Sequence, residues 1–151
     1  MFVPSAFAES IVPFLAMEVM ERGMHMAARG VDVVQMGVGE PDFDAPDSAV
    51  RAAIEALERG RTHYTDSRGL LELREAIAAD SAVRRGGAVS PDDVIVTMGT
   101  SPAIRMVLAT LVDPGDEVIV PTPHYPCYPN MVASVGGTSV LVPTSAVDGF
   151  A

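Results

Sequence analysis

Apolar residues recur along the first half of the chain at the three-to-four-residue spacing of amphipathic helices. The spacing predicts three helices, over residues 13–29, 46–59 and 70–85. A glycine directly follows each of these ranges, and glycine commonly ends helices because it adopts the left-handed backbone conformation without steric cost. In the last of the three helices we expect Leu70, Leu73 and Ile77 to face inward.

From residue 31 onward, short β-branched runs stand between the helical segments. Continuous apolar runs of this length are typical of strands buried on both faces. We predict strands over residues 31–36, 94–98, 117–121 and 138–142, and further helices from the segment 99–102 to about 111 and over 126–135. Repeated strand–helix–strand units predict an α/β fold, with a largely parallel sheet and helices on both faces. The sequence ends a few residues after a strand without the pattern of a closing helix, so we expect the fold to be incomplete.

Composition and charge exclude several classes of protein. The net charge of −10 argues against a nucleic-acid partner, because proteins that bind the phosphate backbone concentrate Lys and Arg on one face. A single cysteine, Cys127, excludes an intrachain disulfide and a multi-cysteine metal site, and we predict no metal. No apolar run approaches the ~20 residues that span a bilayer. The start of the chain lacks the basic residues of a secretory signal, so we expect a cytoplasmic protein with no membrane partner.

The segment Gly99-Thr100-Ser101-Pro102 lies where a predicted strand meets a predicted helix. Glycine allows another group to approach the backbone closely, and the N–H groups and positive dipole end of a helix start bind anions. Thr and Ser are also favoured residues at a helix start, so an ordinary capped helix explains the same pattern. The local sequence leaves both interpretations open.

Tyr125 follows the strand predicted over residues 117–121, at the end of a parallel strand where α/β folds bind ligands. Its ring can stack on a flat ligand, and the neighbouring prolines stiffen the loop. A packed aromatic residue at a turn accounts for Tyr125 equally well, and this alternative also stays open.

Gly37 and Gly39 follow a predicted strand and invite comparison with a dinucleotide-binding turn. That turn requires a third glycine at position 42 and a helix that begins at once. Asp42 occupies that position, and Pro41 obstructs the continuation. We therefore predict no nicotinamide cofactor.

Four segments, in this order and at these spacings, resemble the class I/II aminotransferases, which are fold type I enzymes that use pyridoxal 5'-phosphate. The segments are Gly39-Glu40-Pro41-Asp42-Phe43; Tyr64 ahead of Gly69-Leu70-Leu71-Glu72-Leu73-Arg74; Val96-Thr97-Met98-Gly99-Thr100-Ser101 with Ala103; and Asp113-Pro114-Gly115-Asp116-Glu117-Val118 through Pro121, then Tyr125-Pro126 and Tyr128. The resemblance, closest to aspartate aminotransferases, implies an N-terminal fragment of a three-layer α/β/α fold with a mostly parallel sheet. It implies an N-terminal arm and part of the small domain over residues 1–45, and the first part of the large cofactor-binding domain over residues 46–151.

The resemblance also implies which residues bind the cofactor. Gly99, Thr100 and Ser101 match the cup that holds the cofactor phosphate, which favours the anion site over a simple helix cap. Tyr125 matches the aromatic residue that stacks on the pyridine ring. Pro102 departs from the polar or small residue usual in the family and removes one N–H donor from this turn.

Two further residues match the substrate and subunit contacts of the family. Gly39 matches the glycine whose backbone meets the substrate α-carboxylate. Tyr64 matches a tyrosine that reaches the cofactor phosphate of the other subunit, which implies a homodimer. The implied substrates are an amino acid and a 2-oxo acid.

The implied activity is amino-group transfer, and it requires a Schiff-base lysine. All ten basic residues counted as Lys+Arg are arginines, so this sequence contains no lysine and no catalytic residue is assigned. We expect the full-length protein to be an aminotransferase and the 151-residue chain alone to be inactive. The alternative is a short non-catalytic protein of the same fold that binds pyridoxal phosphate or phosphate, or regulates a partner.

Overall fold

The computed structural model of the protein describes residues 2–150. The chain forms two compact units: the first combines Met1–Glu40 with Ser101–Ala151, and the second is Pro41–Thr100. The elements in chain order are α1 (Ala6–Ser10), α2 (Leu15–Ala27), α3 (Asp47–Glu58), α4 (Leu71–Arg85), the 3-10 turn η1 (Pro91–Asp93), α5 (Thr100–Leu111), β1 (Glu117–Thr122), α6 (Tyr128–Ala133), β2 (Thr138–Pro143) and the 3-10 turn η2 (Ala146–Asp148). Helices with a parallel sheet confirm the predicted α/β class.

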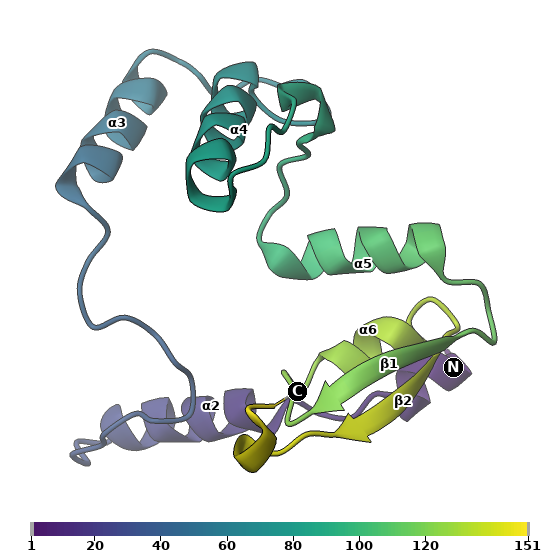
Figure 1. Ribbon diagram of the computed structural model, residues 1–151. Helices are drawn as coiled ribbons and strands as arrows, with labels where there is room; N and C mark the ends of the chain where they lie inside the picture. Colours follow the sequence, from purple (N-terminus) through teal and green to yellow (C-terminus); the bar gives the residue numbers. More distant parts are fainter. Residues whose placement is uncertain (1, 151) are drawn as a thin grey trace. The chain divides into compact units, whose positions relative to one another are not determined.

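The sheet of the first unit consists of β1 and β2, which run parallel and side by side (Figure 1). The register pairs Glu117 with Thr138 at one end and Thr122 with Pro143 at the other. Parallel neighbours require a crossover connection, and α6 provides it, packing on both strands. The core of this unit lies at that contact, where Val132 of α6 is 2% exposed and Val120 of β1 is 5% exposed. The strands predicted over 117–121 and 138–142 are confirmed.

The predicted helices are confirmed, and α2 ends at the predicted glycine. Gly30 has a φ of +81°, and its N–H donates to the Ala27 carbonyl at 2.9 Å. The N–H of Val31 donates to the Met26 carbonyl at 3.2 Å, which completes a glycine-closed helix end. The short helix α1 was not predicted, and Ser5 caps it.

In the second unit the buried side chain of Arg74 joins the start of α4 to η1. Its Nε donates to the Gly69 carbonyl at 3.1 Å, and its Nη1 donates to the Pro91 carbonyl at 2.8 Å. Nη1 also lies 3.5 Å from Asp92 Oδ1. Arg74 is 3% exposed, and its guanidinium requires such partners because an unpaired buried charge is strongly unfavourable.

Two predicted strands are not formed by the described residues. The segment Val31–Met36 is irregular, and Val94–Met98 carries no strand pairing. Val94 still has the extended backbone that its β-branched run favours, with φ −101° and ψ 127°. The Val96 N–H donates to the Arg68 carbonyl of a turn, at 2.9 Å, rather than to a neighbouring strand. These two predictions were wrong, because an apolar run favours an extended backbone but a strand also needs a paired neighbour.

The predicted inward face of α4 was also wrong. Leu70, Leu73 and Ile77 are exposed, whereas Arg74 and Ala78 are the buried residues of this helix. The reason is that the face covered by η1 is the one from which the Arg74 guanidinium reaches backbone carbonyls.

Candidate cofactor site

The backbone is open at Gly99, just before α5. Gly99 has a φ of +87°, and no atom of the described residues lies within 4 Å of the position that a Cβ would occupy. The Thr97 hydroxyl donates to the Gly99 carbonyl at 2.6 Å and holds the turn. Helix α5 then begins at Thr100, and the N–H groups of a first helical turn have no partner within the helix. The predicted phosphate-binding residues Gly99, Thr100 and Ser101 therefore stand consecutively at a helix start, with Pro102 as the one position that lacks an N–H.

Tyr125 lies in the loop between β1 and α6, between two other aromatic rings. Its ring makes T-shaped contacts with Phe14, at a centroid distance of 5.4 Å and an interplanar angle of 80°, and with Tyr128, at 5.4 Å and 66°. Tyr125 remains 44% exposed, so part of its surface is available to a ligand. The neighbouring Cys127 side chain, together with desolvation, raises the pKa of the Tyr125 phenol, which stays neutral at physiological pH.

Gly39 and Tyr64 are the remaining predicted site residues, and both are open. Gly39 belongs to the first unit, and no atom lies within 4 Å of the position that a Cβ would take there. Tyr64 belongs to the second unit, in the segment between α3 and α4, and its side chain is fully exposed. The backbone at Gly39 is therefore open, and the Tyr64 side chain is exposed.

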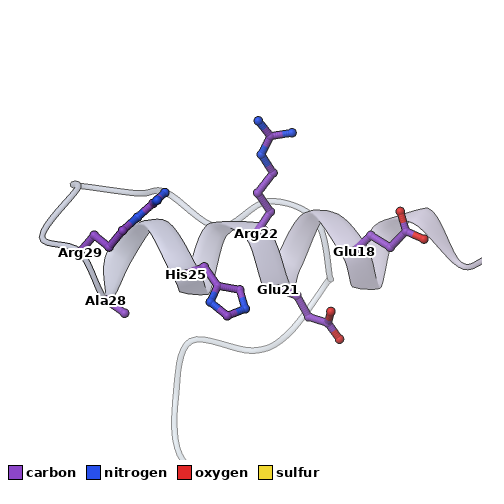
Figure 2. A pocket seen from close by; sticks show the side chains of 6 residues that line it. All are labelled: Glu18, Glu21, Arg22, His25, Ala28 and Arg29. Atoms are coloured by element: carbon purple, nitrogen blue, oxygen red, sulfur yellow. The ribbon is translucent and has the colours of Figure 1, made fainter.

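A hollow of about 540 Å³ runs along the polar side of α2 (Figure 2). Its lining residues are Glu18, Glu21, Arg22, His25, Ala28 and Arg29. All its lining residues come from this helix and the turn that ends it, and in Figure 2 the charged side chains diverge rather than converge on one point. It has the character of a solvated helix face.

Within residues 2–150, no three His, Cys, Asp or Glu side chains gather as a metal site, and no helix has the length and apolar character needed to cross a membrane.

Comparison with known proteins identifies the class to which this fold and site belong. Residues 31–151 match the family model of class I and II aminotransferases. This match covers well over half of the chain, so the chain belongs to the class I and II aminotransferase family. Enzymes of this family generally depend on pyridoxal phosphate.

Individual relatives agree with the family match. The chain is 40% identical over 142 residues to the probable aspartate/prephenate aminotransferase of Thermus aquaticus, covering 94% of this chain and 37% of that protein. It is 38% identical over 128 residues to the (5-formylfuran-3-yl)methyl phosphate transaminase of Methanocaldococcus jannaschii, covering 85% of this chain and 35% of that protein. The structure of aspartate aminotransferase from Thermus thermophilus with maleate superposes with a TM-score of 0.93 at 38% identity, covering 99% of this chain and 39% of that chain. The chain thus spans somewhat more than a third of the length of these relatives.

The residues present fit two of the three parts of pyridoxal phosphate. Its phosphate is an anion, which suits the open backbone at Gly99 and the helix start with the Thr100 and Ser101 hydroxyls. Its ring is flat and aromatic, which suits the exposed part of the Tyr125 ring. Its aldehyde would require a lysine amine, and the sequence contains no lysine.

Sequence reasoning did not single out Phe14, which contacts Tyr125, or Asn130, which bonds to the segment just before Phe14. Asn130 exchanges two hydrogen bonds with the backbone of Val12, across a sequence separation of 118 residues. No local motif marks such a contact, because it depends on how α6 and the start of the chain meet. Arg74 did stand within a segment that carries the family resemblance, but its burial was not foreseen.

Proposed function

We propose that this chain provides the phosphate-binding and ring-binding part of a pyridoxal-phosphate-dependent aminotransferase that acts on an amino acid and a 2-oxo acid. The observation that carries the proposal is the family match over residues 31–151, which includes the open glycine and hydroxyl pair at the start of α5. The names of the relatives, which include aspartate, prephenate and other substrates, support the reaction class rather than one amino acid.

Each site residue has a distinct task in this proposal. The first-turn N–H groups of α5 and the hydroxyls of Thr100 and Ser101 hold the phosphate, with the helix dipole favouring the anion. Tyr125 offers its exposed ring surface to the pyridine ring, and the Gly39 backbone meets the substrate carboxylate. When bound, pyridoxal phosphate supplies the electron sink for bond cleavage at the amino-acid Cα. The chain has no lysine to carry the proton at that carbon, so we propose that the 151-residue chain alone does not transaminate.

The same proposal extends to assembly and location. The exposed Tyr64 ring supports a homodimer in which this residue reaches the cofactor of the other subunit. We assign residues 1–45 to an N-terminal arm with part of the small domain, and residues 46–151 to the first part of the large domain. A cytoplasmic location is part of this proposal.

Equilibrium dialysis of the chain against pyridoxal phosphate tests the binding part. We expect saturable binding that weakens about tenfold or more for Thr100→Val and Ser101→Ala, because hydrogen bonds to a charged group contribute about 1.5–3 kcal/mol. Thr110→Val is the matched control. It removes a hydroxyl of the same helix, and this hydroxyl bonds only to the Met106 carbonyl. Binding that none of these changes alters would contradict the assigned phosphate site.

A second candidate function follows from the absence of lysine: a non-catalytic protein that binds pyridoxal phosphate or phosphate reversibly. A chimera separates the two candidates. In it, this chain is joined to the part of the Thermus thermophilus enzyme that the chain does not cover. Amino transfer by the chimera, lowered by Ser101→Ala but not by Thr110→Val, supports the aminotransferase. A folded chimera that binds pyridoxal phosphate without any turnover supports the non-catalytic protein. The chain alone, mixed with cofactor and an amino-acid/2-oxo-acid pair, serves as the inactive reference.

A further inference from the structure

Asn130 holds the start of the chain against α6 with a pair of hydrogen bonds. Its Oδ1 accepts from the Val12 N–H at 3.2 Å, and its Nδ2 donates to the Val12 carbonyl at 2.8 Å. A side-chain amide that satisfies both backbone groups of one residue fixes its position and its orientation, as a neighbouring strand would. We call residues 11–14 the N-terminal strap. Both bonds lie within the first compact unit, so they belong to one body.

The strap places Phe14 two residues beyond the fixed Val12, where its ring meets Tyr125. Phe14 and Tyr128 form T-shaped contacts with Tyr125, each at a centroid distance of 5.4 Å. Edge-to-face aromatic pairs in this range are attractive and directional. Tyr128 belongs to α6, the helix that also carries Asn130, whereas Phe14 stands just before α2. Two segments far apart in the sequence therefore contact the Tyr125 ring.

Contacts from other segments matter for Tyr125 because no helix or strand holds this residue. It lies in a loop outside regular structure, and nearly half of its surface is exposed. A ring with that freedom loses conformational entropy when a flat ligand stacks on it, and this loss weakens binding. Contacts that hold the ring before the ligand arrives remove part of that cost.

We propose that Phe14 and Asn130 are positioning residues for Tyr125, and that the N-terminal strap sets the orientation in which this tyrosine receives the cofactor ring. Asn130 acts by fixing Val12, and Phe14 acts by contact with Tyr125. The consequence for the cofactor rests on the proposed function, in which Tyr125 stacks on pyridoxal phosphate. The orientation of the ring itself does not rest on it.

Fluorine NMR of the chain labelled with fluorotyrosine tests the positioning directly. The sequence contains three tyrosines, so the spectrum has three resonances, and the Tyr125→Phe variant assigns the relevant one. We expect Phe14→Leu and Asn130→Ala to move the Tyr125 resonance at least halfway towards its position in the urea-unfolded chain. Phe2→Leu, at a fully exposed phenylalanine, is the matched control and should leave it unchanged. A Tyr125 resonance that stays unmoved in both Phe14→Leu and Asn130→Ala overturns the proposal.

Asn130→Asp adds a rescue that a general loss of packing would not show. A carboxylate at this position still accepts from the Val12 N–H but repels the Val12 carbonyl, whereas the protonated carboxyl donates to it as the amide does. We expect the Tyr125 resonance of this variant to return towards the wild-type position as the pH is lowered, and that of Asn130→Ala to stay displaced. The same behaviour in both variants would count against the two-bond mechanism.

Pyridoxal phosphate affinity, measured by dialysis on the same variants, connects the strap to the cofactor. We expect the dissociation constant to rise about 3- to 10-fold in Phe14→Leu and Asn130→Ala, in line with the cost of immobilising one side chain. Wild-type affinity in both variants, beside a weakened Tyr125→Ala, overturns the consequence for the cofactor. If Tyr125→Ala itself binds as the wild type does, the role of Tyr125 in the proposed function fails, and the fluorine spectra alone support or overturn the positioning.

Discussion

The two compact units of the chain are held by different kinds of interaction. In the second unit, Pro41–Thr100, the central contact is polar: the Arg74 guanidinium is buried and bonded to the carbonyls of Gly69 and Pro91. In the first unit it is apolar and aromatic: Val132 and Val120 are buried between α6 and the strands, and the Tyr125 ring lies beside two other rings. An arginine contact depends on charge and exact partners, whereas an apolar contact depends on shape and volume.

This difference predicts that the two units respond to different perturbations. Changes in backbone geometry, hydrogen bonding or acidity should affect the second unit most, and changes in side-chain volume should affect the first. Hydrogen exchange reports each unit separately, through the amides of α4 for the second unit and those of β1 and β2 for the first. The substitutions below follow in order of expected effect.

Gly69→Ala should have the largest effect, and it should fall on the second unit. Gly69 has a φ of +99°, and an added Cβ would lie 2.6 Å from Val96 Cβ. The left-handed backbone costs about 1–2 kcal/mol for an alanine, and overpacking adds about 1–3 kcal/mol. We expect the exchange of α4 amides to accelerate by about a hundredfold or more, with β1 and β2 unchanged. Gly60→Ala is the control, because it carries the positive φ without a close neighbour and should show only the smaller backbone cost.

Arg74→Leu should follow, again within the second unit. The leucine keeps an apolar stem but leaves the Gly69 carbonyl without its donor and the Pro91 carbonyl with only the longer bond from the Val94 N–H, at 3.4 Å. An unsatisfied buried acceptor costs about 1–3 kcal/mol. Urea unfolding monitored at α4 should shift to lower denaturant accordingly. Arg84→Leu, which breaks only an exposed pair with Asp80 at 2.8 Å, should change little. Equal effects of the two substitutions would show that the buried contact is not special.

Val132→Ala should destabilise the first unit by a smaller amount. The side chain is 2% exposed, and two buried methyl groups are lost at about 0.8 kcal/mol each. We expect a loss of about 1.5–2 kcal/mol, seen as faster exchange in β1 and β2 while α4 keeps its protection. Val83→Ala, at an exposed position of α4, provides the comparison on the other unit. Faster exchange in α4 alone would mean that the assignment of this core is wrong.

A change of pH should have the smallest effect, and the two units should respond to it in opposite directions. The Arg68 N–H and nearby guanidiniums lower the pKa of Asp66, and local hydrogen bonds, including one from Arg61, lower the pKa of Glu72. A lowered carboxyl pKa stabilises the fold above the ordinary value near 4, and this contribution is lost as the pH falls through the lowered value. Circular dichroism should therefore show a loss of second-unit helix in acid that Asp66→Asn reduces. In the first unit, the raised pKa of Tyr125 acts in the opposite range, with stability lost as the pH rises through it.

Local patterns predicted most of the fold, and the two strands that were wrongly predicted failed for one cause. The helices were predictable because amphipathic spacing and a closing glycine lie within one segment, as for α2 and Gly30. Strands β1 and β2 were predictable because the crossover through α6 makes them neighbours. Val94–Met98 has the same type of residues as β1 and an extended start, but it finds a turn carbonyl rather than a strand. Residue preference sets the backbone of a segment, whereas pairing is decided by other parts of the chain.

The candidate site was predictable to the same extent. Gly99, Thr100 and Ser101 stand in one short motif at a helix start, so the sequence could place them together. Whether this motif binds an anion could not be read locally, since the same residues cap ordinary helices. The surroundings of Tyr125 could not be predicted locally, because Phe14 contacts it from a distant segment, and that segment is bonded through Val12 to Asn130. The sequence predicted Tyr125 as a site residue, but it did not predict the contact with Phe14.

The hydrogen bonds between Val12 and Asn130 also join two segments that are synthesised at different times. They close a loop of 118 residues, and loop closure of this length costs roughly 4 kcal/mol, against about 1–3 kcal/mol from two hydrogen bonds. The contact therefore cannot form ahead of the structure around it and must wait until β1 and α6 have been made and have folded. The N-terminal strap is thus made well before its partner Asn130 and is fixed only after it, and Phe14 stays exposed to water while more than a hundred residues are added behind it.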